Sequence, residues 1–560
     1  MADYFQVGEK STSAAHGTAY PTKPIPLEPK RGPPSYNFNS RRSPLICTNG
    51  AVASSQPLAS QIGLDILKKG GNAADAAVAV AAALAVTEPC STGLGGDMFA
   101  LYYEASTKTV QAINGSGKSS HSATLENYLA VAVADSDFPG EKKLPKFHAM
   151  TVTVPGAAKG WEDVHNRWGT KLEESGSAPS ISFADLLEPA ASLSEGGFPV
   201  QSTTSWAWHN GIPQIRQWSG NGSANAVDGG GRVPFTCAGS GQPPREGEVF
   251  SNPDLAATLR ELGAFGAGRF YEGRVGKEIV KAVTRHGGLL EEIDLISHKS
   301  SFPQPISASY MDHDIWEIPP NGQGIGALVG LESLKEVERV TKLPLGTDEN
   351  ERNPKSASAL HAMIECMRLG FGDIKEFVGD GVDSNSILDV NRIKKRVKDC
   401  YDDTTSRCKN LPGESSCTVS FQVVDQWGNA ISFVNSNYMG FGTGIVPANC
   451  GFCLQNRGFG FSLEKSHPNC VGPAKRPLHT IIPCMVTTKG TRGGDFVASI
   501  SNMGGNMQPQ GHMQLVVNLL KYKMDVQSAV DWERFCIRDG SRDGDVFLEE
   551  GSCDEEARRN

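Results

Sequence analysis

The segment from Ala73 to Val86 places the strongest constraint on how this chain can fold. It is apolar at almost every position, mostly alanine, and its charged residue is Asp75. A helix that is apolar around most of its circumference must lie inside the protein, away from water. The segment is too short and too weakly hydrophobic to cross a bilayer, which needs about 20 predominantly apolar residues. The sequence therefore predicts a buried helix, which Asn72 caps and Pro89 ends.

Helical and strand periodicities alternate along the rest of the chain and predict a mixed α+β fold. Residues 57–69 carry Leu58, Ile62 and Ile66 on one helical face, and Met98 begins an apolar strand. Further helices are predicted over Phe183–Ser194, Pro253–Leu262, Glu278–His286 and Ser356–Phe371.

Composition places limits on size, compartment and partners. The chain has 560 residues, 39% hydrophobic and 21% charged, enough for one large domain or two or three ordinary ones. The net charge of -9 gives no sign of nucleic-acid binding, so the expected partner is a small molecule. Residues 1–43 are rich in Pro, Lys and Ser and are predicted to be a disordered lead-in. The 13 cysteines without a secretory signal indicate free thiols, hence a cytoplasmic protein that does not bind a membrane.

A redox pair and a metal site were both considered from residue spacing. Cys450-Gly-Phe-Cys453 has the CxxC spacing of a redox motif. Its flanks are typical of strands and turns, whereas a redox-active pair is expected at a helix N-terminus, which lowers the thiol pKa. The redox role is therefore the less favoured alternative. The 12 histidines show no HxxxH or HExxH spacing, so neither a metal site nor a cofactor is predicted.

Thr418 stands where a loop meets a strand. A polar, loop-like stretch runs from about Lys395 to Ser416, and an alternating strand then ends at Asp425; after the turn Gln426–Asn429 a second strand completes a hairpin. A threonine hydroxyl is a poor nucleophile unless a base removes its proton, and the α-amine of an N-terminal threonine can be that base. Such an amine titrates at about 7.7 to 8.0, which suits neutral pH. Cleavage between Cys417 and Thr418 would create this nucleophile, although a threonine at a strand start is also an ordinary structural feature.

Blocks from about Asn49 to Val526 resemble the γ-glutamyltranspeptidase superfamily of N-terminal-nucleophile hydrolases. They include Gly70-Gly-Asn-Ala-Ala-Asp, Gly93-Leu-Gly-Gly-Asp, Val154-Pro-Gly-Ala-Ala-Lys-Gly-Trp, Asn252-Pro-Asp-Leu, Phe441-Gly-Thr-Gly-Ile, Lys475-Arg-Pro-Leu and Gly504-Gly505, in the family's order. The resemblance implies a four-layer αββα sandwich. It also implies one precursor that is processed into a large-subunit region, residues 44–417, and a small-subunit region, residues 418–560, which together form one catalytic domain.

The resemblance also implies roles for single residues. Thr418 falls on the family's nucleophile and Ser436 on a hydroxyl residue that supports it, while the second threonine that often follows the nucleophile is Val419 here. Gly504 and Gly505 fall on the pair whose N–H groups form the oxyanion hole, where glycine lets the substrate carbonyl approach the backbone closely. Without the family context, a simple tight turn would explain this glycine pair.

The positions that grip a γ-glutamyl group in the family are changed. Ser116 stands at or near the place of the family's arginine, and His479-Thr480 replaces a pair of serines. Gly460 replaces the carboxylate that would bind an ammonium, and a nearby amide becomes Arg457. A substrate ammonium would therefore meet a like charge.

These departures resemble the branch that includes oxamate amidohydrolase and cephalosporin-acylase-like proteins. The same branch is indicated by Pro319-Pro-Asn-Gly-Gln-Gly and by the run Ser436-Asn437-Tyr438. In that branch Arg457 would bind the carboxylate of a small acid amide, with Asn437 and Tyr438 in the same pocket. The alternative for Arg457 is a salt-bridged arginine on a strand edge.

The expected function is an autoprocessing amidohydrolase that cleaves the amide of a small, oxamate-like substrate through an acyl-enzyme. Two alternatives stay open: a γ-glutamyltransferase acting on glutathione, and an unprocessed, inactive relative that serves as a binding protein. Val419 favours the second. So does the region after Asp543, where the family continues with further strands and the small-subunit region is expected to be C-terminally shortened.

Overall fold

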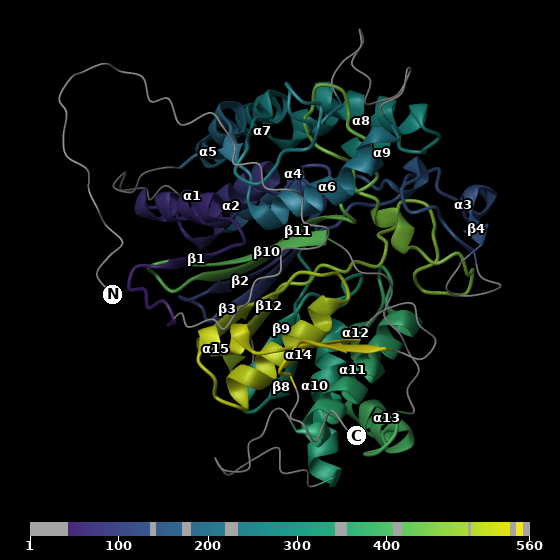
Figure 1. Ribbon diagram of the computed structural model, residues 1–560. Helices are drawn as coiled ribbons and strands as arrows, with labels where there is room; N and C mark the ends of the chain where they lie inside the picture. Colours follow the sequence, from purple (N-terminus) through teal and green to yellow (C-terminus); the bar gives the residue numbers. More distant parts are fainter. Residues whose placement is uncertain are drawn as a thin grey trace.

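The computed structural model describes residues 43–134, 142–170, 181–218, 233–341, 356–406, 417–490, 494–537 and 545–552. Two β-sheets lie at its centre with helices on either side of them (Figure 1). The mixed α+β class predicted from the sequence is confirmed. The predicted lead-in, apart from Ser43, lies outside the described residues.

The first sheet has five strands in the order β1-β10-β11-β2-β3, and all neighbours are antiparallel. Its strands are β1 (Ala51–Ala53), β2 (Asp97–Glu104), β3 (Thr109–Gly115), β10 (Cys417–Val424) and β11 (Ala430–Tyr438). The predicted hairpin is therefore confirmed as β10 and β11, and it lies between strands from the other end of the chain. Its first strand begins one residue earlier than predicted, because Cys417 already pairs with Tyr438.

The second sheet has four strands in the order β13-β12-β9-β8. They are β8 (Ile306–Tyr310), β9 (His313–Glu317), β12 (Cys484–Thr488) and β13 (Phe496–Ile500). Apolar side chains from both sheets form one cluster, with Phe99 and Leu101 from the first sheet beside Trp316 and Met485 from the second. Burial of these side chains holds the two sheets together.

The alanine-rich helix predicted from the sequence is α2 (Ala73–Thr87), and every residue in it is buried. It contacts β10 and β11 on one side and α1 (Pro57–Lys68), α4 (Ala157–Trp168) and α5 (Phe183–Gly196) around the rest. Its charged residue, Asp75, accepts hydrogen bonds from the backbone and hydroxyl of Thr170 and lies 2.9 Å from Nδ1 of His165. These bonds offset the cost of burying the carboxylate.

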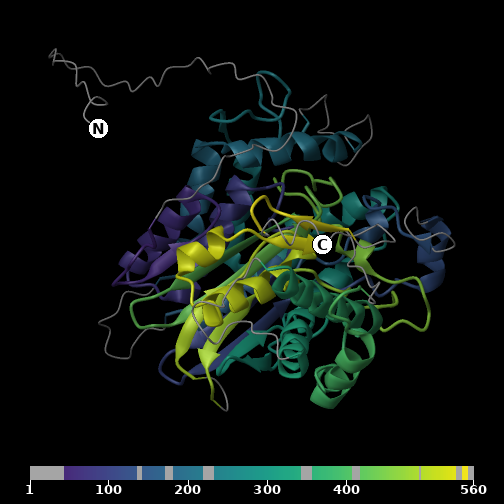
Figure 2. The ribbon, with the colours of Figure 1, turned by 60° about the horizontal axis from the view of Figure 1, so that its bottom comes forward.

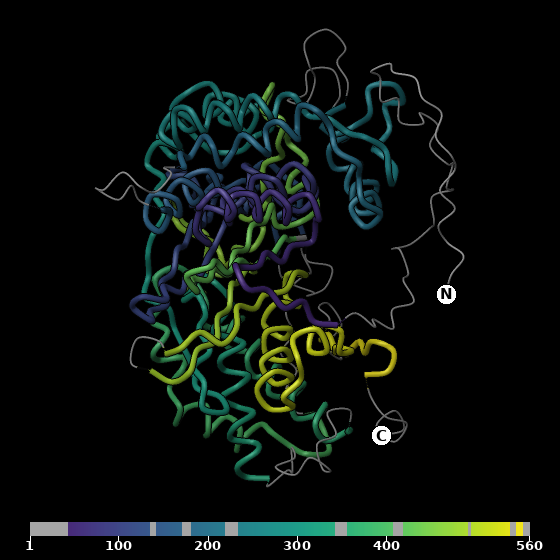
Figure 3. The backbone as a smooth tube through the Cα atoms, turned by 90° about the vertical axis from the view of Figure 1, so that its left-hand side faces the viewer, coloured from purple at the N-terminus to yellow at the C-terminus, as the bar shows by residue number. Residues whose placement is uncertain are grey.

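A second group of helices covers the far face of the second sheet. Apolar residues of α10 (Ile325–Thr341), α11 (Ala357–Phe377) and α14 (Met507–Leu520) form one core with β8 and β12. The first two helices and α13 (Val390–Cys400) lie together, teal to green, in Figure 2, and α14 packs beside α10 although it comes from the last part of the chain (Figure 3).

The remaining elements connect these layers. They are α3 (Leu125–Val131), α6 (Ser202–Arg216), α7 (Pro253–Glu272), α8 (Arg274–Arg285), α9 (Glu292–Ile296), α12 (Ser384–Ile387), α15 (Val526–Asp531), η1 (Ala149–Thr151), η2 (Arg457–Gly460), and the two-stranded sheets β4–β5 (Val133–Ala134, Lys142–Lys143), β6–β7 (Phe198–Pro199, Val249–Phe250) and β14–β15 (Phe535–Ile537, Val546–Leu548). None of the helices within the described ranges is both long and apolar enough to span a membrane. The cytoplasmic location stays a prediction.

The structure corrects one segment before Thr418. The polar stretch predicted as a loop from about Lys395 begins inside α13, which continues to Cys400. Ile393 and Val397 of this helix are buried in the core, and this packing outweighs the polar character of the other positions. Residues 407–416 lie outside the described residues.

Candidate active site

Thr418 lies where the pairing of β10 with β11 is irregular. The register shifts between Cys417 and Val419, with Thr418 at the shift. Such a bulge re-aims a side chain and is common beside active sites. Thr418 is 2% exposed, and its hydroxyl donates a hydrogen bond to Ser436 Oγ over 3.2 Å. Val419 packs into the apolar core, so the position where the family often has a second threonine serves packing here.

A buried arginine lies next to this pair of hydroxyls. Arg457, the first residue of η2, donates from Nη2 to Ser436 Oγ at 3.5 Å and from Nη1 to Thr480 Oγ1 at 2.9 Å. Its guanidinium lies over the ring of Tyr438, with Cζ 4.0 Å from the ring centroid, in a cation–π contact. The structure thus brings together Thr418 and four of the residues predicted to surround it.

Tyr438 holds a strained backbone conformation in order to reach Arg457. Its φ of 76° falls in the left-handed region that non-glycine residues rarely adopt. A residue held there costs of order 1–3 kcal/mol, and such residues cluster at functional sites. The backbone N–H of Tyr438 also donates to Ser436 Oγ at 2.8 Å, which binds the strained residue to the hydroxyl pair.

Arg457 carries a charge that the protein does not pair. It is completely buried, and no carboxylate within the described ranges lies at ion-pair distance from it. Its Nε has no hydrogen-bond partner among the described residues. Burial lowers the pKa of Arg457 to about 10, so it remains a cation at neutral pH. The alternative of a salt-bridged arginine on a strand edge is therefore wrong.

Asp97 is a buried carboxylate of the site that the sequence analysis missed. Its Oδ1 accepts hydrogen bonds from the backbone N–H groups of Gly117 at 2.9 Å and Gly156 at 3.1 Å and from Gln455 Nε2 at 3.0 Å. Its Oδ2 lies 3.0 Å from Nε2 of His479. Burial alone would raise the pKa of Asp97, but the hydrogen bond from His479 and the field of Arg457 bring it below its usual value.

His479 is neutral in this arrangement. It is completely buried, and burial together with the nearby Arg457 lowers its pKa to about 4. The pocket therefore contains one cation, Arg457, and one anion, Asp97. The anion has four hydrogen-bond donors around it, whereas the cation has donor capacity left over.

The predicted oxyanion pair connects to the same cluster through Gln323. Gly504 and Gly505 have φ of 106° and 59°, which require glycine, and they come just before α14. The Nε2 of Gln323 donates to the carbonyl of Thr480 at 2.6 Å and to the carbonyl of Gly505 at 2.9 Å. One amide therefore links the glycine turn to the segment that holds Arg457.

Two predicted binding residues lie outside the hydrogen-bond chain from Thr418 to Gly505. Ser116 Oγ accepts from Asn321 Nδ2 at 3.2 Å, and this amide also donates to the carbonyl of Pro477 at 2.7 Å. The side chain of Asn437 donates to the carbonyl of Pro89 at 3.4 Å, because successive residues of β11 face opposite sides. Substrate contacts by Ser116 and Asn437 stay predictions.

The residues that were missed were present in the sequence blocks. Asp97 ends Gly93-Leu-Gly-Gly-Asp, and Asn321 and Gln323 lie in Pro319-Pro-Asn-Gly-Gln-Gly. The available signal was a polar side chain inside a glycine-rich block. Nothing in the local pattern indicates that these blocks meet Thr418.

A buried trio of potential ligands behind the glycine turn has the geometry of a hydrogen bond. Ligand atoms of Glu317, Cys484 and His512 lie within 4.8 Å of one another. However, Nδ1 of His512 is 2.6 Å from Oε1 of Glu317, whereas two ligand atoms of a tetrahedral zinc with bonds of about 2.0 Å lie roughly 3.3 Å apart. The pair therefore fastens α14 to β9.

The CxxC motif does not have the thiol chemistry of a redox pair. Cys450 and Cys453 are buried, free cysteines. Burial raises the pKa of Cys450 to about 12 and the pKa of Cys453 well above its ordinary value. Redox-active cysteines need a lowered pKa. The structure gives the redox alternative no support.

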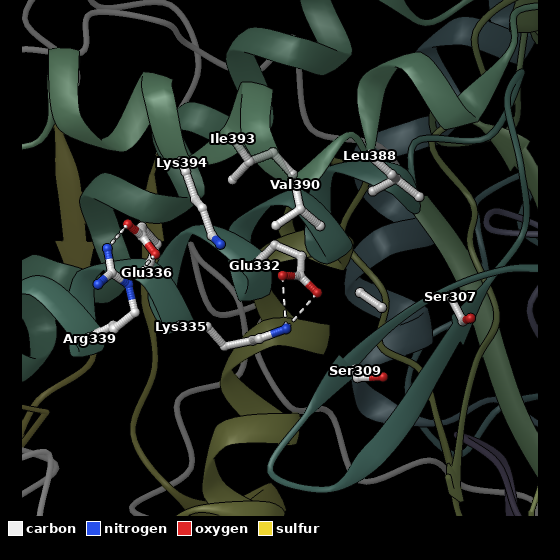
Figure 4. Close-up of a pocket in the computed structure, with 11 residues that line it drawn as sticks. Ser307, Ser309, Glu332, Lys335, Glu336, Arg339, Leu388, Val390, Ile393 and Lys394 are labelled. Carbon is white, nitrogen blue, oxygen red and sulfur yellow. Dashed lines mark hydrogen bonds and ion pairs between the residues drawn. The ribbon is translucent and has the colours of Figure 1, made fainter. Parts of the chain in front are cut away.

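A cavity of about 580 Å³ lies away from this cluster, between β8, α10 and α13 (Figure 4). Its charged residues on α10 are paired within the helix, Lys335 with Glu332 and Arg339 with Glu336. No residue of the Thr418 cluster lines it.

Comparisons with known proteins agree on one family. Residues 59–558 match the family model Gamma-glutamyltranspeptidase. The chain is 32% identical over 499 residues to the glutathione hydrolase-like YwrD proenzyme of Bacillus subtilis (strain 168), covering 88% of this chain and 85% of that protein. It is 28% identical over 497 residues to the oxamate amidohydrolase proenzyme of Klebsiella pneumoniae, covering 88% and 86%. The crystal structure of cephalosporin acylase from Bacillus halodurans matches with a TM-score of 0.77 and 34% identity, covering 93% and 89%. The chain belongs to the gamma-glutamyltranspeptidase family.

Proposed function

We propose that this chain is an autoprocessing amidohydrolase that uses Thr418 to cleave the amide of a small substrate carrying a carboxylate. The observation that carries the proposal is Arg457, a fully buried cation with an unpartnered Nε, one hydroxyl away from Thr418. A buried charge without a counter-ion costs several kcal/mol, and an anionic ligand with charge-assisted hydrogen bonds would offset that cost. The printed name of one relative, oxamate amidohydrolase, is consistent with such a substrate.

The first step is cleavage of the chain itself. Thr418 Oγ attacks the carbonyl carbon of Cys417, the C–N bond between the two residues breaks, and an ester forms. Water then hydrolyses the ester, which leaves a carboxylate on Cys417 and a free α-amine on Thr418. The products are the large-subunit region, ending at residue 417, and the small-subunit region 418–560. The register shift at Thr418 and the proenzyme names of the relatives support this step.

In turnover the free α-amine of Thr418 accepts the hydroxyl proton while Oγ attacks the substrate amide. The N–H groups of Gly504 and Gly505 hold the oxyanion, and Arg457 holds the substrate carboxylate. The amide C–N bond breaks, ammonia leaves with the proton, and water hydrolyses the remaining acyl ester. The sequence of helices, sheet, sheet and helices suits the four-layer αββα sandwich in which the family builds this site.

A γ-glutamyl substrate is the less favoured alternative because of its ammonium group. A carboxylate would have to receive this ammonium, and Asp97, the buried carboxylate of the cluster, already accepts four hydrogen bonds. Arg457 would repel the ammonium at close range. A binding protein that is never cut is the second alternative.

One preparation separates these possibilities. On a denaturing gel the purified chain should give two bands, and N-terminal sequencing of the smaller one should begin at Thr418. The cut protein should hydrolyse oxamate and leave a γ-glutamyl anilide nearly untouched. A single full-length band would favour the binding protein, and substantial anilide turnover would favour the glutamyl enzyme.

A further inference from the structure

We propose that Asp97 is a positioning residue of this site, which holds His479 in one tautomer and acts as the buried counter-charge of Arg457 without occupying its donors. The inference deepens the proposed function and rests on it, because it explains how the pocket keeps a cation available for an anionic substrate. Asp97 is the first residue of β2 and lies directly opposite Ser436 of β11 in the sheet register.

The carboxylate of Asp97 is held from three separate segments. The N–H groups of Gly117, after β3, and Gly156, before α4, both point at Oδ1, and so does the amide of Gln455. A Cβ at Gly156 would come within 3.0 Å of Oδ1 and within 1.9 Å of the Gly115 carbonyl oxygen, so the backbone approaches the carboxylate as closely as it can. With Oδ1 saturated, Oδ2 is aimed at His479.

The hydrogen bonds of His479 determine where its proton lies. A neutral imidazole has one N–H, and an ionised carboxylate can only accept. Nε2 faces Oδ2 of Asp97 at 3.0 Å, while Nδ1 accepts from the backbone N–H of Ile481 at 3.4 Å. The proton therefore belongs on Nε2. Since Thr480 is the next residue and its hydroxyl receives Nη1 of Arg457, the orientation of His479 is transmitted to the guanidinium.

The charge of Asp97 acts on Arg457 through space. The groups that face this guanidinium are the ring of Tyr438, the neutral His479 and the carboxylate of Asp97. A direct ion pair would occupy the planar donors of the arginine, but here Asp97 is saturated by other groups. Burial lowers the pKa of Arg457 to about 10, and the field of Asp97 opposes a further fall. The arrangement stabilises the cation and leaves its donors for a ligand.

The variant Asp97→Asn removes the charge with little change of shape. Its amide oxygen can replace Oδ1 and keep three donors, but its NH₂ then faces the Nε2–H of His479, donor against donor. We expect the proton of His479 to move to Nδ1. Nitrogen NMR of the full chain with labelled histidine, assigned by the loss of one signal in His479→Asn, measures this directly. An unchanged tautomer in Asp97→Asn would overturn the proposal, whatever the substrate of the protein is.

The pH profile of kcat/KM for oxamate provides the second readout. In Asp97→Asn the alkaline limb should move down by about one pH unit or more, because Arg457 loses its counter-charge. The acid limb, set by the Thr418 amine, should stay. The matched control is Asp75→Asn, which removes another buried carboxylate bonded to a histidine, His165 at 2.9 Å, and should leave both limbs in place.

A further variant distinguishes charge from packing. His479→Gln keeps an N–H donor toward Asp97 and should retain the wild-type alkaline limb, so a shifted limb in this variant would assign the effect to disturbed packing and overturn the proposal. If the wild-type protein does not hydrolyse oxamate but the tautomer still moves in Asp97→Asn, the substrate class is wrong and the role of Asp97 stands. If oxamate is hydrolysed and neither the limb nor the tautomer moves, the role of Asp97 is wrong.

Discussion

Two clusters of positive charge in this molecule differ in how they are neutralised. In the cavity between β8, α10 and α13, Lys335 lies 2.7 and 2.8 Å from the two carboxylate oxygens of Glu332, and Arg339 is bonded to Glu336 in the same way (Figure 4). These pairs belong to one helix and are partly in contact with solvent. At the Thr418 cluster, Arg457 is fully buried and has no carboxylate bonded to it among the described residues.

The difference shows which of the two places bears the stronger mark of function. A helical ion pair in water contributes about 0.2–0.5 kcal/mol, so its presence needs no ligand to explain it. A buried charge without a partner costs several kcal/mol and persists where another role requires it. The volume of the cavity is therefore a poorer guide than the unpaired charge. The predictions below test this comparison, from the largest effect to the smallest.

Thr418→Ala should abolish both chain cleavage and hydrolysis. The substitution removes the hydroxyl that attacks the Cys417 carbonyl and the substrate, so the protein should remain a single 560-residue chain on a denaturing gel. Lys394→Ala, which changes a residue lining the cavity, should be cut like the wild type. Two bands from Thr418→Ala would remove the basis for treating this cluster as the active site.

Arg457→Gln should lower kcat/KM for oxamate by about 100-fold or more, since breaking a buried charged contact costs roughly 2–5 kcal/mol. Steady-state kinetics on the cut protein measures the loss. The matched change in the cavity, Lys335→Gln, should alter kcat/KM by less than about twofold, as expected for a surface substitution. Equal effects from the two variants would mean that the unpaired charge is not what distinguishes the two regions.

Gln323→Ala should reduce kcat about tenfold to 100-fold, because the carbonyls of Thr480 and Gly505 lose a shared donor and the glycine turn is held less firmly. Single-turnover kinetics with oxamate measures the effect. Gln111→Ala is the control, because its side chain bonds Trp168 rather than the cluster. A kcat close to wild type in Gln323→Ala would place the oxyanion donors elsewhere.

Lys335→Ala should change the free energy of unfolding by only about 0.2–0.5 kcal/mol, the value of an exposed helical pair. Urea unfolding at low salt measures the change, and added salt should reduce it. A loss well above 1 kcal/mol would show that the ion pairs around the cavity are not ordinary surface pairs.

Local patterns in the sequence were sufficient for the elements and for much of the site. The buried helix, the hairpin that begins beside Thr418, and the helices α5, α7, α8 and α11 follow from periodicity and capping residues. Arg457, Tyr438, Thr480 and Ser436 came from the family resemblance, and the structure places them in contact with one another. Arg457 on a strand edge and a loop starting at Lys395 were wrong, because burial in the core decided both segments.

What the sequence determined by itself is a set of short-range choices: a helix with no polar face must be buried, and alternating residues around a turn must form a hairpin. Only the tertiary structure decided that this hairpin inserts between β1 and β2. That insertion places Ser436 opposite Asp97 and, through 382 residues of separation, Asp97 beside His479. The physical reason is that charge pairing and strand register depend on which distant segments meet, and periodicity within a segment carries no information about its distant partner.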